Sequence, residues 1–527
     1  MRIDGKVRLE RVVTTLHGSS RVAIELVEMA YRGTLACVSI RVFDKLGPYS
    51  TRTAGEWTRS QPVQKGKPIR QRLSRWLAPL ALLLGATQPL HAATVAPTPP
   101  MGWNSWDAYG FTIDEAEFKA NTRVLAGWKG LGWSYAVIDE GWYMADPFGK
   151  DLAARHYLLD KYGRLMPVVA RFPSAADGHG LRALANWVHA QGLKFGIHII
   201  RGIPKAAVEA NMPIAGSRFH AADAADKAAT CPWDDGNYGI ADNAAGQAYY
   251  DSLIRQYADW GVDFLKVDCI ADHPYRPSEI RQIGRAIAKS GRPIVLSLSP
   301  GPAQVAHAAE MARWAQMWRI ANDLWDGWTL PSLDPATSFP NGVFSAFDNL
   351  AKWNPYVAPG RWPNADMLPF GPLDPHPGWG DPRPSRLTPA EVRTAFTLWS
   401  IARSPLILGG RLTGYDAATK AVVTNKAVIA LDQQDRTSRP ITDLPPSLTD
   451  ARVWASSPRG RAVDTVAIFN VGDRSLMVDV PWSALDVTGK AVSACDLWQH
   501  RALPASPKVE TKVEAHDVTV LHLGRCG

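Results

Sequence analysis

Acidic residues follow four short apolar segments of this sequence, each at the point where a β-strand is expected to end. They are Asp139 and Glu140 after Tyr-Ala-Val-Ile, Asp268 after Phe-Leu-Lys-Val, Asp323 after Trp-Arg-Ile-Ala-Asn, and Asp366 after Asn-Ala. One such residue is as often a solvated strand end as a functional group, but four in succession indicate a shared site. In a barrel of parallel strands these ends all face the catalytic mouth.

Two of these segments also carry a cation beside the carboxylate. Lys266 lies two residues before Asp268 and therefore points to the same side of the strand, and Arg319 lies four residues before Asp323. A neighbouring cation holds a carboxylate ionised, as a nucleophile requires. Two carboxylates that flank a pocket are the minimum for glycosidic cleavage, because one attacks the anomeric carbon while the other protonates the departing oxygen and then activates water.

Tryptophan is abundant near these acids. Of the 21 tryptophans, 19 follow residue 92, and four of them lie close to expected strand ends: Trp103, Trp106, Trp142 and Trp362. Most of the 19 are expected in the core. The rings nearest the acids are candidates for stacking on the apolar face of a sugar, and an indole N–H can donate to a hydroxyl group.

Alternating strands and helices between residues 98 and 412 position these side chains. Helical stretches such as 115–131, 180–191, 246–261, 277–290 and 389–403 separate most of the strands. This alternation predicts a (β/α)₈ TIM barrel. An open doubly wound sheet is disfavoured, because no Gly-rich phosphate loop follows the first strand. The expected strands are Met101–Trp106, Tyr135–Trp142, Lys194–Ile200, Asp263–Asp268, Pro293–Ser299, Trp314–Ile320, Arg361–Met367 and Leu406–Gly410.

Residues 425–527 have a different pattern. Short apolar runs at 452–456, 465–470, 475–480 and 517–523 are separated by polar or Gly/Pro turns, and no convincing helix interrupts them. This pattern predicts a C-terminal antiparallel β-sandwich domain. Cys495 and Cys526 both fall in this domain and can staple it.

Residues 1–92 are expected to form a leader. They contain 15 Lys and Arg against six Asp and Glu, whereas the rest of the chain has a net charge of −1, so a nucleic acid partner is not expected. A basic stretch from Lys65, the apolar run 76–87 and the small residues at Ala92 and Ala93 predict a signal peptide over about 65–92. We therefore expect export to the periplasm or the extracellular space, with no membrane partner after cleavage. Residues 1–64 receive no function, and translation that begins nearer Pro68 is an alternative.

Cysteine and histidine spacing argues against a metal site. Cys231, Cys269, Cys495 and Cys526 remain after the leader, an even number that makes disulfides plausible in an exported chain. No close Cys pair has zinc spacing. His198 stands alone at its strand end, so neither a metal nor another cofactor is expected.

Several longer motifs resemble glycoside hydrolase family 27, the melibiase or α-galactosidase family. The likeness runs in the family's order from about residue 98 to 435. The matching segments are Pro-Pro-Met-Gly-Trp-Asn-Ser-Trp106, Val-Ile-Asp-Glu-Gly-Trp142, Gly-Arg-Leu-Met-Pro167, Arg-Phe-Pro-Ser174, Gly-Leu-Lys-Phe-Gly-Ile197, Asp-Phe-Leu-Lys-Val-Asp268, Asn-Ala-Asp-Met-Leu368, Ser-Pro-Leu-Ile-Leu-Gly409 and Val-Ile-Ala-Leu-Asp-Gln433.

The resemblance implies residue roles. It makes Asp268 the nucleophile and Asp323 the acid/base of a retaining reaction. Cys231 matches a family cysteine that pairs beside the nucleophile, which implies a Cys231–Cys269 disulfide, and a Cys495–Cys526 disulfide is expected as a second. The implied sugar-contacting residues are Trp106, Asp139, Glu140, His198, Lys266, Arg319 and Asp366, with His198 in a place usually held by Tyr.

Three departures from the family bear on the sugar. Glu140 stands where a second aspartate is usual, Cys269 lies one residue early, and Ser299-Pro300-Gly301 replaces the Cys-Glu-Trp that reads the 2-position of galactose. The resemblance implies a retaining exo-glycosidase for terminal α-D-galactosides. The alternatives are the same mechanism on a β-L-arabinopyranoside, an α-N-acetylgalactosaminide or an isomaltosyl group, and a catalytically silent sugar-binding protein.

Overall fold

A computed structural model describes residues 95–147, 156–333, 339–374 and 381–526, together with the backbone of three strands near the N-terminus. The chain divides into two units, Met1–Gln88 and Pro89–Gly527. The first contains an antiparallel sheet of β1 (Leu9–Thr14), β2 (Val22–Tyr31) and β3 (Thr34–Phe43). The predicted signal segment lies outside the described residues.

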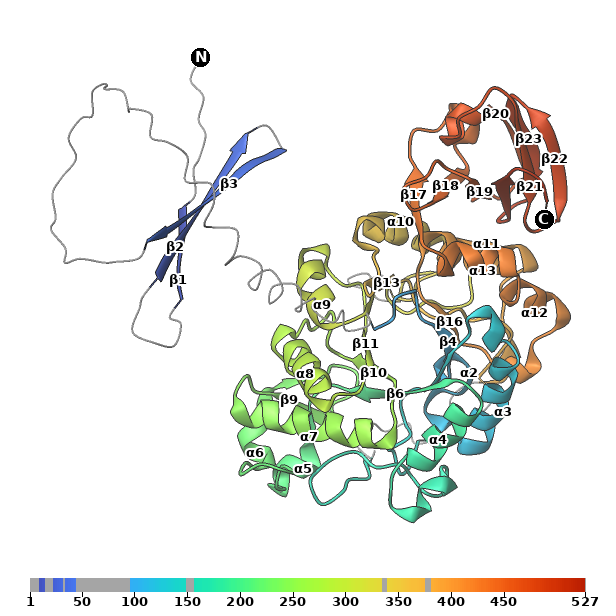
Figure 1. The fold of residues 1–527 in the computed structure, drawn as a ribbon. Coiled ribbons are helices and arrows are strands. Elements are labelled where there is room, and N and C mark those ends of the chain that lie inside the picture. Colours follow the sequence, from blue (N-terminus) through green and yellow to red (C-terminus); the bar gives the residue numbers. More distant parts are fainter. Residues whose placement is uncertain are drawn as a thin grey trace, which may run out of the picture. The chain divides into compact units, whose positions relative to one another are not determined.

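Eight parallel strands form the centre of the second unit (Figure 1). Their order in the sheet is β13-β12-β11-β10-β6-β5-β4-β16, and Leu368 closes the circle beside β16 by bonding Ile407 O at 2.8 Å and Gly409 N at 2.9 Å. The predicted (β/α)₈ barrel is thus confirmed. The strands are β4 (Met101–Asn104), β5 (Tyr135–Ile138), β6 (Lys194–Ile200), β10 (Phe264–Asp268), β11 (Val295–Leu298), β12 (Met317–Arg319), β13 (Trp362–Asn364) and β16 (Leu406–Leu408).

Helices surround these strands, and their termini follow local sequence signals (Figure 1). Asp114 and Glu117 form a capping box at the start of α3, and Thr388 and Glu391 form another at α11. Gly261, with a φ of 91°, ends α7 in the left-handed conformation. The main helices are α3 (Glu115–Ala126), α4 (Arg182–Ala190), α7 (Ala244–Trp260), α8 (Pro277–Ser290), α9 (Ala308–Trp314), α10 (Val343–Trp353), α11 (Pro389–Ala402), α12 (Ala417–Val423) and α13 (Lys426–Gln433).

Shorter elements complete this unit at the barrel rim and between the strands. They are the helices α2 (Trp106–Tyr109), α5 (Lys205–Glu209) and α6 (Ala221–Ala224), the small sheet β7 (Ile203–Pro204), β9 (Asn237–Ile240) and β8 (Ala225–Thr230), and the pair β14 (Pro372–Leu373) and β15 (Arg383–Pro384).

The barrel interior changes from apolar to charged along the strands. Phe264 packs in a buried apolar cluster with Tyr135 and Val137. Because side chains on a strand alternate with period two, Lys266 and Asp268 share the side of Phe264 and continue that row toward the strand's carboxyl end. The residues after Ile138 leave the strand as a turn, which is why the observed β5 is shorter than the predicted one.

The C-terminal region contains two antiparallel sheets, which confirms the predicted β-sandwich (Figure 1). The first strand begins at Arg436, after α13. Residues such as Ile468, Val478 and Leu521 share its buried apolar core. The larger sheet is β17 (Arg436–Ile441), β18 (Ala451–Pro458), β19 (Thr465–Asn470), β24 (Val518–Leu523), β21 (Val492–Asp496) and β22 (Arg501–Ser506), and the smaller pairs β20 (Leu476–Pro481) with β23 (Lys508–Val513).

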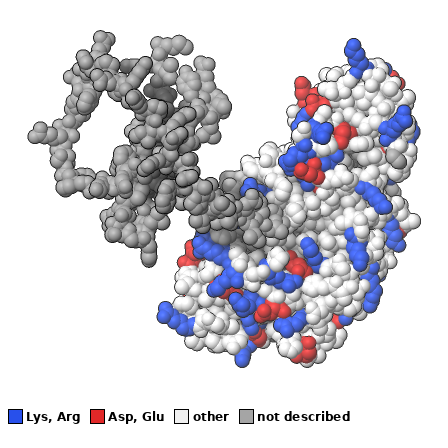
Figure 2. All heavy atoms as spheres, in the orientation of Figure 1, with Lys and Arg blue, Asp and Glu red and all other residues white. Residues whose placement is uncertain are grey.

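Charge is mixed on the visible surface of the described residues. Figure 2 shows basic and acidic side chains interspersed over this face. In the described ranges no helix is long and apolar enough to cross a membrane.

Candidate active site

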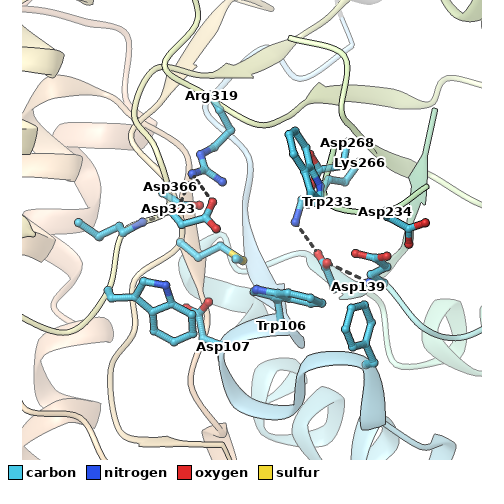
Figure 3. Close-up of a pocket in the computed structure, with 15 residues that line it drawn as sticks. Trp106, Asp107, Asp139, Trp233, Asp234, Lys266, Asp268, Arg319, Asp323 and Asp366 are labelled. Carbon is cyan, nitrogen blue, oxygen red and sulfur yellow. Dashed lines mark hydrogen bonds and ion pairs between the residues drawn. The ribbon is translucent and has the colours of Figure 1, made fainter. Parts of the chain in front are cut away.

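The carboxyl ends of the barrel strands surround a cavity of about 300 Å³ (Figure 3). It is lined by eight of the nine residues that the sequence assigned to catalysis or sugar contact: Trp106, Asp139, Glu140, Lys266, Asp268, Arg319, Asp323 and Asp366. The fold therefore brings together side chains from β10 and β12 and from the segments that follow β4, β5, β12 and β13.

Asp139 and Lys266 form a buried ion pair on one side of the cavity. Lys266 Nζ donates to Asp139 Oδ2 at 2.8 Å, and Asn104 Nδ2 donates to the same oxygen at 2.6 Å. Burial alone would raise the pKa of Asp139, but the charges of Lys266 and His198, together with hydrogen bonds from Lys266 and from the Glu140 backbone, outweigh it and lower this pKa to about 2. Asp139 is therefore ionised at neutral pH.

Asp268 ends β10 beside this pair. Its Oδ1 accepts from Cys269 N at 2.7 Å, and its Oδ2 lies 3.5 Å from His198 Nε2. Burial opposes ionisation, but His198 and the Lys266 charge together lower the pKa of Asp268. An ionised carboxylate that faces a cavity has the protonation state that a nucleophile needs.

His198 lies behind the carboxylates rather than on the cavity wall. Its side chain is fully buried in β6, 3.5 Å from Asp268 and 4.0 Å from Asp139 Oδ1. The sequence had placed it among the sugar contacts. Here its nearest charged neighbours are the two acids, so its position suits support of the nucleophile.

Asp323 and Asp366 share one cation on the other side of the cavity (Figure 3). Arg319 donates to Asp323 Oδ1 at 3.0 Å and approaches Asp366 Oδ2 at 2.8 Å. The Asp323 side chain is 42% exposed, so solvent and a leaving group can reach it. Burial, partly offset by Arg319 and reinforced by the Asp323 charge, raises the pKa of Asp366 to about 6.

Two further carboxyl groups in the cavity lack a direct cationic partner. Burial and the Asp234 carboxylate raise the pKa of Glu140 well above its usual range, and burial with Asp366 does the same for Asp107. Among the described residues, Glu140 Oε1 and Asp107 Oδ2 are buried without a hydrogen-bond partner. A bound hydroxyl group can satisfy such an atom, which points to a polar ligand.

Aromatic rings complete the wall. Trp106 packs edge-on against Phe111, with ring centroids 5.0 Å apart, and Trp233 enters from another loop. Figure 3 shows Trp106 and Trp233 on different sides of the carboxylates. An apolar ring face beside several carboxyl groups matches the two surfaces of a pyranose.

The sequence missed cavity residues that arrive on loops. Asp107 directly follows Trp106, and Trp233 and Asp234 lie two and three residues after Cys231. The signal that could have found the last two was the disulfide, which ties their loop to the nucleophile strand. Phe111, Leu324, Trp325 and Met367 also line the cavity without having been predicted.

Both predicted disulfides are confirmed. Cys231 and Cys269 are bonded with a Cα–Cα distance of 6.0 Å, and Cys495 and Cys526 with 5.0 Å. The first bond includes the residue after Asp268, so it ties the end of β10 and the loop with Trp233 to one another.

A second cavity of about 500 Å³ borders the first. It is lined by Asp268, Asp323 and Trp233 together with Pro232, His273, Pro300, Asn322 and Phe339. Pro300 stands where the resemblance expected a carboxylate, so this side of the site offers no acid at that position. Across the part of the chain that the structure describes, no group of three His, Cys, Asp or Glu residues is placed to hold a metal ion.

A TIM barrel whose mouth holds several carboxyl groups beside aromatic rings is the arrangement of a glycoside hydrolase. The sequence matches the family described as "Alpha galactosidase A" over residues 98–210 and 231–434, and "Alpha galactosidase C-terminal beta sandwich domain" over residues 449–523. The chain belongs to this family, which is glycoside hydrolase family 27.

Relatives in the family act on different sugars. The chain is 28% identical over 428 residues to an α-galactosidase of Cyamopsis tetragonoloba, which covers 80% of this chain and 84% of the relative. It is 27% identical over 358 residues to an α-N-acetylgalactosaminidase of Gallus gallus, with 64% and 71% covered. A solved family 27 β-L-arabinopyranosidase of Geobacillus stearothermophilus, in complex with arabinose, is 39% identical, with a TM-score of 0.75 and coverage of 82% and 98%.

Proposed function

We propose that the protein is a retaining exo-glycosidase that removes a terminal pyranose of galacto configuration. The observation that carries this proposal is the placement of Asp268, held ionised, in the same cavity as the solvent-accessible Asp323. The cavity of about 300 Å³ is at the small end of the range for ligand pockets and suits one sugar ring.

In the first step of this mechanism, the Asp268 carboxylate forms a bond to the anomeric carbon. The bond from that carbon to the leaving oxygen breaks, and Asp323 transfers its proton to this oxygen. In the second step, water attacks the anomeric carbon, Asp323 takes up a proton from the water, and the bond to Asp268 breaks. Two inversions give net retention. The larger cavity borders both acids and is open to receive the leaving group.

Among galacto-configured sugars, we propose that β-L-arabinopyranosides are preferred over α-D-galactosides. The two differ in the hydroxymethyl arm that only galactose carries. Glu140 is one methylene longer than the usual aspartate, and it is buried in the wall beside Asp139. A longer side chain there reduces the room for the arm. The 39% identical relative is named for the pentose, which supports the same order.

This order reverses the expectation from the sequence, in which galactose came first. Galactoside hydrolysis stays the second candidate because Asp139, Lys266, Arg319 and Asp366 form the rest of the expected constellation. Selection at the 2-position is expected to be weak. Pro300 supplies neither an acid for the 2-hydroxyl group nor a donor for an N-acetyl group.

A panel of nitrophenyl glycosides tests the proposal. The panel contains the β-L-arabinopyranoside, α-D-galactoside, α-N-acetylgalactosaminide and α-glucoside, compared by kcat/KM. We expect the arabinopyranoside first and the galactoside second. Exclusive hydrolysis of the glucoside or the N-acetylgalactosaminide would show that the sugar assignment is wrong.

Glu140→Asp tests the selecting residue. Shortening the side chain by one methylene opens space for the arm, so the ratio of arabinopyranoside to galactoside kcat/KM should fall about tenfold or more. Wild type and variant are compared on the same two substrates. An unchanged ratio would remove Glu140 from the account of specificity while leaving the mechanism intact.

We also propose that the chain is exported and that the mature protein begins near Ala93. The two disulfides support an oxidising location. N-terminal sequencing of protein purified from the native host tests this. A mature chain that retains residues 1–64 would contradict it.

A further inference from the structure

A carboxyl group beside Glu140 comes from the loop that follows Cys231. Asp234 is buried, with 3% exposed, lines the same cavity, and lies on the Asp139 side of it (Figure 3). It makes none of the ion pairs described above for the catalytic residues. It lines the same cavity as Glu140, the residue proposed above to select for the pentose.

The loop holds Asp234 rigidly from two directions. On one side, the Cys231–Cys269 disulfide ties it to the nucleophile strand. On the other, Asp234 Oδ1 accepts from Tyr157 Oη at 2.6 Å and from Gly236 N at 2.9 Å. A Cβ atom at residue 236 would lie 2.3 Å from Tyr157 Oη, so glycine there is required for this contact. The Asp234 carboxyl group is therefore fixed rather than free to turn away.

Glu140 and Asp234 are both buried and line the same cavity, and Glu140 Oε1 has no hydrogen-bond partner among the described residues. The carboxyl groups that act most on Glu140 are Asp234, Asp268 and Asp139, and the buried Tyr143 hydroxyl group is a further neighbour. Lys266, the cation on this side of the cavity, pairs with Asp139. Burial and the Asp234 carboxylate raise the pKa of Glu140 well above its usual range. Two buried carboxyl groups in contact are stable only when they hold a proton between them.

We propose that Asp234 and Glu140 share one proton, and that Asp234 is a positioning residue that directs the Glu140 carboxyl group at the space of the hydroxymethyl arm. This inference rests on the proposed pentose selectivity. When the pair loses its proton to solvent at higher pH, the two carboxylates repel. Glu140 then turns away from the fixed Asp234, and selection against the arm weakens.

The first test measures the ratio of arabinopyranoside to galactoside kcat/KM against pH. In the wild type, the ratio should fall through one ionisation as pH rises. Asp234→Asn keeps the shape of the side chain but donates an amide N–H, which favours ionised Glu140. Because this N–H takes the place of the shared proton and removes the repulsion, the variant should keep the acidic wild-type ratio at every pH. The matched control is Asp235→Asn, since Asp235 is the adjacent exposed residue and pairs with Lys205 at 3.0 Å. It should retain the wild-type profile.

A flat wild-type ratio, or a wild-type profile in Asp234→Asn, would overturn the proposal. A second measurement needs no sugar and so separates this inference from the proposed function. In infrared difference spectra of the free protein at neutral pH, Glu140→Gln and Asp234→Asn should each lack the same protonated-carboxyl band of the wild type, while the band of Asp107 remains and Asp235→Asn keeps both. If Asp234→Asn loses no band that Glu140→Gln loses, the shared proton is contradicted, whatever sugar the enzyme prefers.

Discussion

The two walls of the active-site cavity have similar composition but different protonation. Each contains one buried cation beside a pair of carboxylates, Lys266 with Asp139 and Asp268 and Arg319 with Asp323 and Asp366. Lys266 donates a hydrogen bond to Asp139 Oδ2, which also accepts one from Asn104. The pKa of Asp139 is lowered to about 2. Arg319 is divided between Asp323 and Asp366, and the pKa of Asp366 rises to about 6.

Hydrogen bonds and neighbouring like charges, rather than the number of charges, therefore set the protonation states of these carboxyl groups. Burial opposes ionisation on both walls. On the Lys266 side, directed donors outweigh it, whereas on the Arg319 side the second carboxylate adds to it. One wall is thus suited to an ionised nucleophile, and the other to holding and returning a proton.

The largest effect is expected from removing the nucleophile. Asp268→Asn keeps the volume but cannot form the glycosyl-enzyme, so kcat should fall by at least about 10³-fold on every substrate. Single-turnover kinetics checks this, with Asp263→Asn, outside the cavity, as a folding-sensitive comparison. Near-normal turnover in Asp268→Asn would transfer the role to another carboxylate.

On the opposite wall, Asp323→Asn should show dependence on the leaving group. Proton transfer contributes about 10²–10⁴-fold, and a leaving group that departs as a stable anion needs little of it. We expect a severe loss of kcat/KM with sugar or alkyl leaving groups and a milder loss with dinitrophenyl glycosides. An equal loss across the series would mean that Asp323 does not act as the acid.

Lys266→Met should raise the pKa values of the carboxyl groups on the Lys266 wall, as burial raises that of Asp366 on the Arg319 wall. The cation lowers the pKa of Asp268 and of Asp139, so its removal raises both, and the nucleophile is protonated up to a higher pH. The acidic limb of the kcat/KM profile should therefore shift to higher pH. Lys205→Met, which removes an exposed cation paired with Asp235, is the control and should leave the limb unchanged. An unmoved limb in Lys266→Met would contradict the electrostatic account.

The smallest effect concerns stability. The pKa of Asp107 is raised on folding, chiefly by burial, so the folded state keeps a proton that the unfolded chain releases at lower pH. Stability contributed by this group is complete below the unfolded pKa and is lost as pH rises through the folded pKa. Asp107→Asn removes that loss, and its Tm should exceed the wild-type Tm by a few degrees at alkaline pH and by less at acidic pH. The opposite trend in thermal melts would show that Asp107 is ionised.

Most of the barrel was predictable because its strands are buried on both faces. Residues 195–200 are apolar apart from His198, and residues 264–268 carry Lys266 and Asp268 toward the carboxyl end of an otherwise apolar strand. In the sandwich, β17, β21, β22 and β23 were not among the expected runs. The strands β17 and β22 are the two edges of the larger sheet, and an edge strand tolerates Pro440, Pro504 and exposed polar residues that hide the strand pattern.

The site was predictable where chemistry follows a strand and not where it enters on a loop. Asp139, Lys266, Asp268 and Arg319 lie on strands or directly after them, so topology gathers them. Trp233 and Asp234 are distant in sequence from the other residues that line this cavity. The Cys231–Cys269 disulfide is what links their loop to β10. Local patterning cannot give the direction of such a loop, because side-chain contacts such as Tyr157 to Asp234 decide it.

Double displacement through Asp268 determines the anomer in which the released sugar first appears, so that anomer is the most direct evidence for or against it. Proton NMR during hydrolysis of the preferred nitrophenyl glycoside distinguishes the two anomers before they equilibrate. The account predicts that the released sugar first appears with the anomeric configuration of the substrate. Initial release of the opposite anomer would contradict it, because a single displacement by water needs no nucleophile at Asp268.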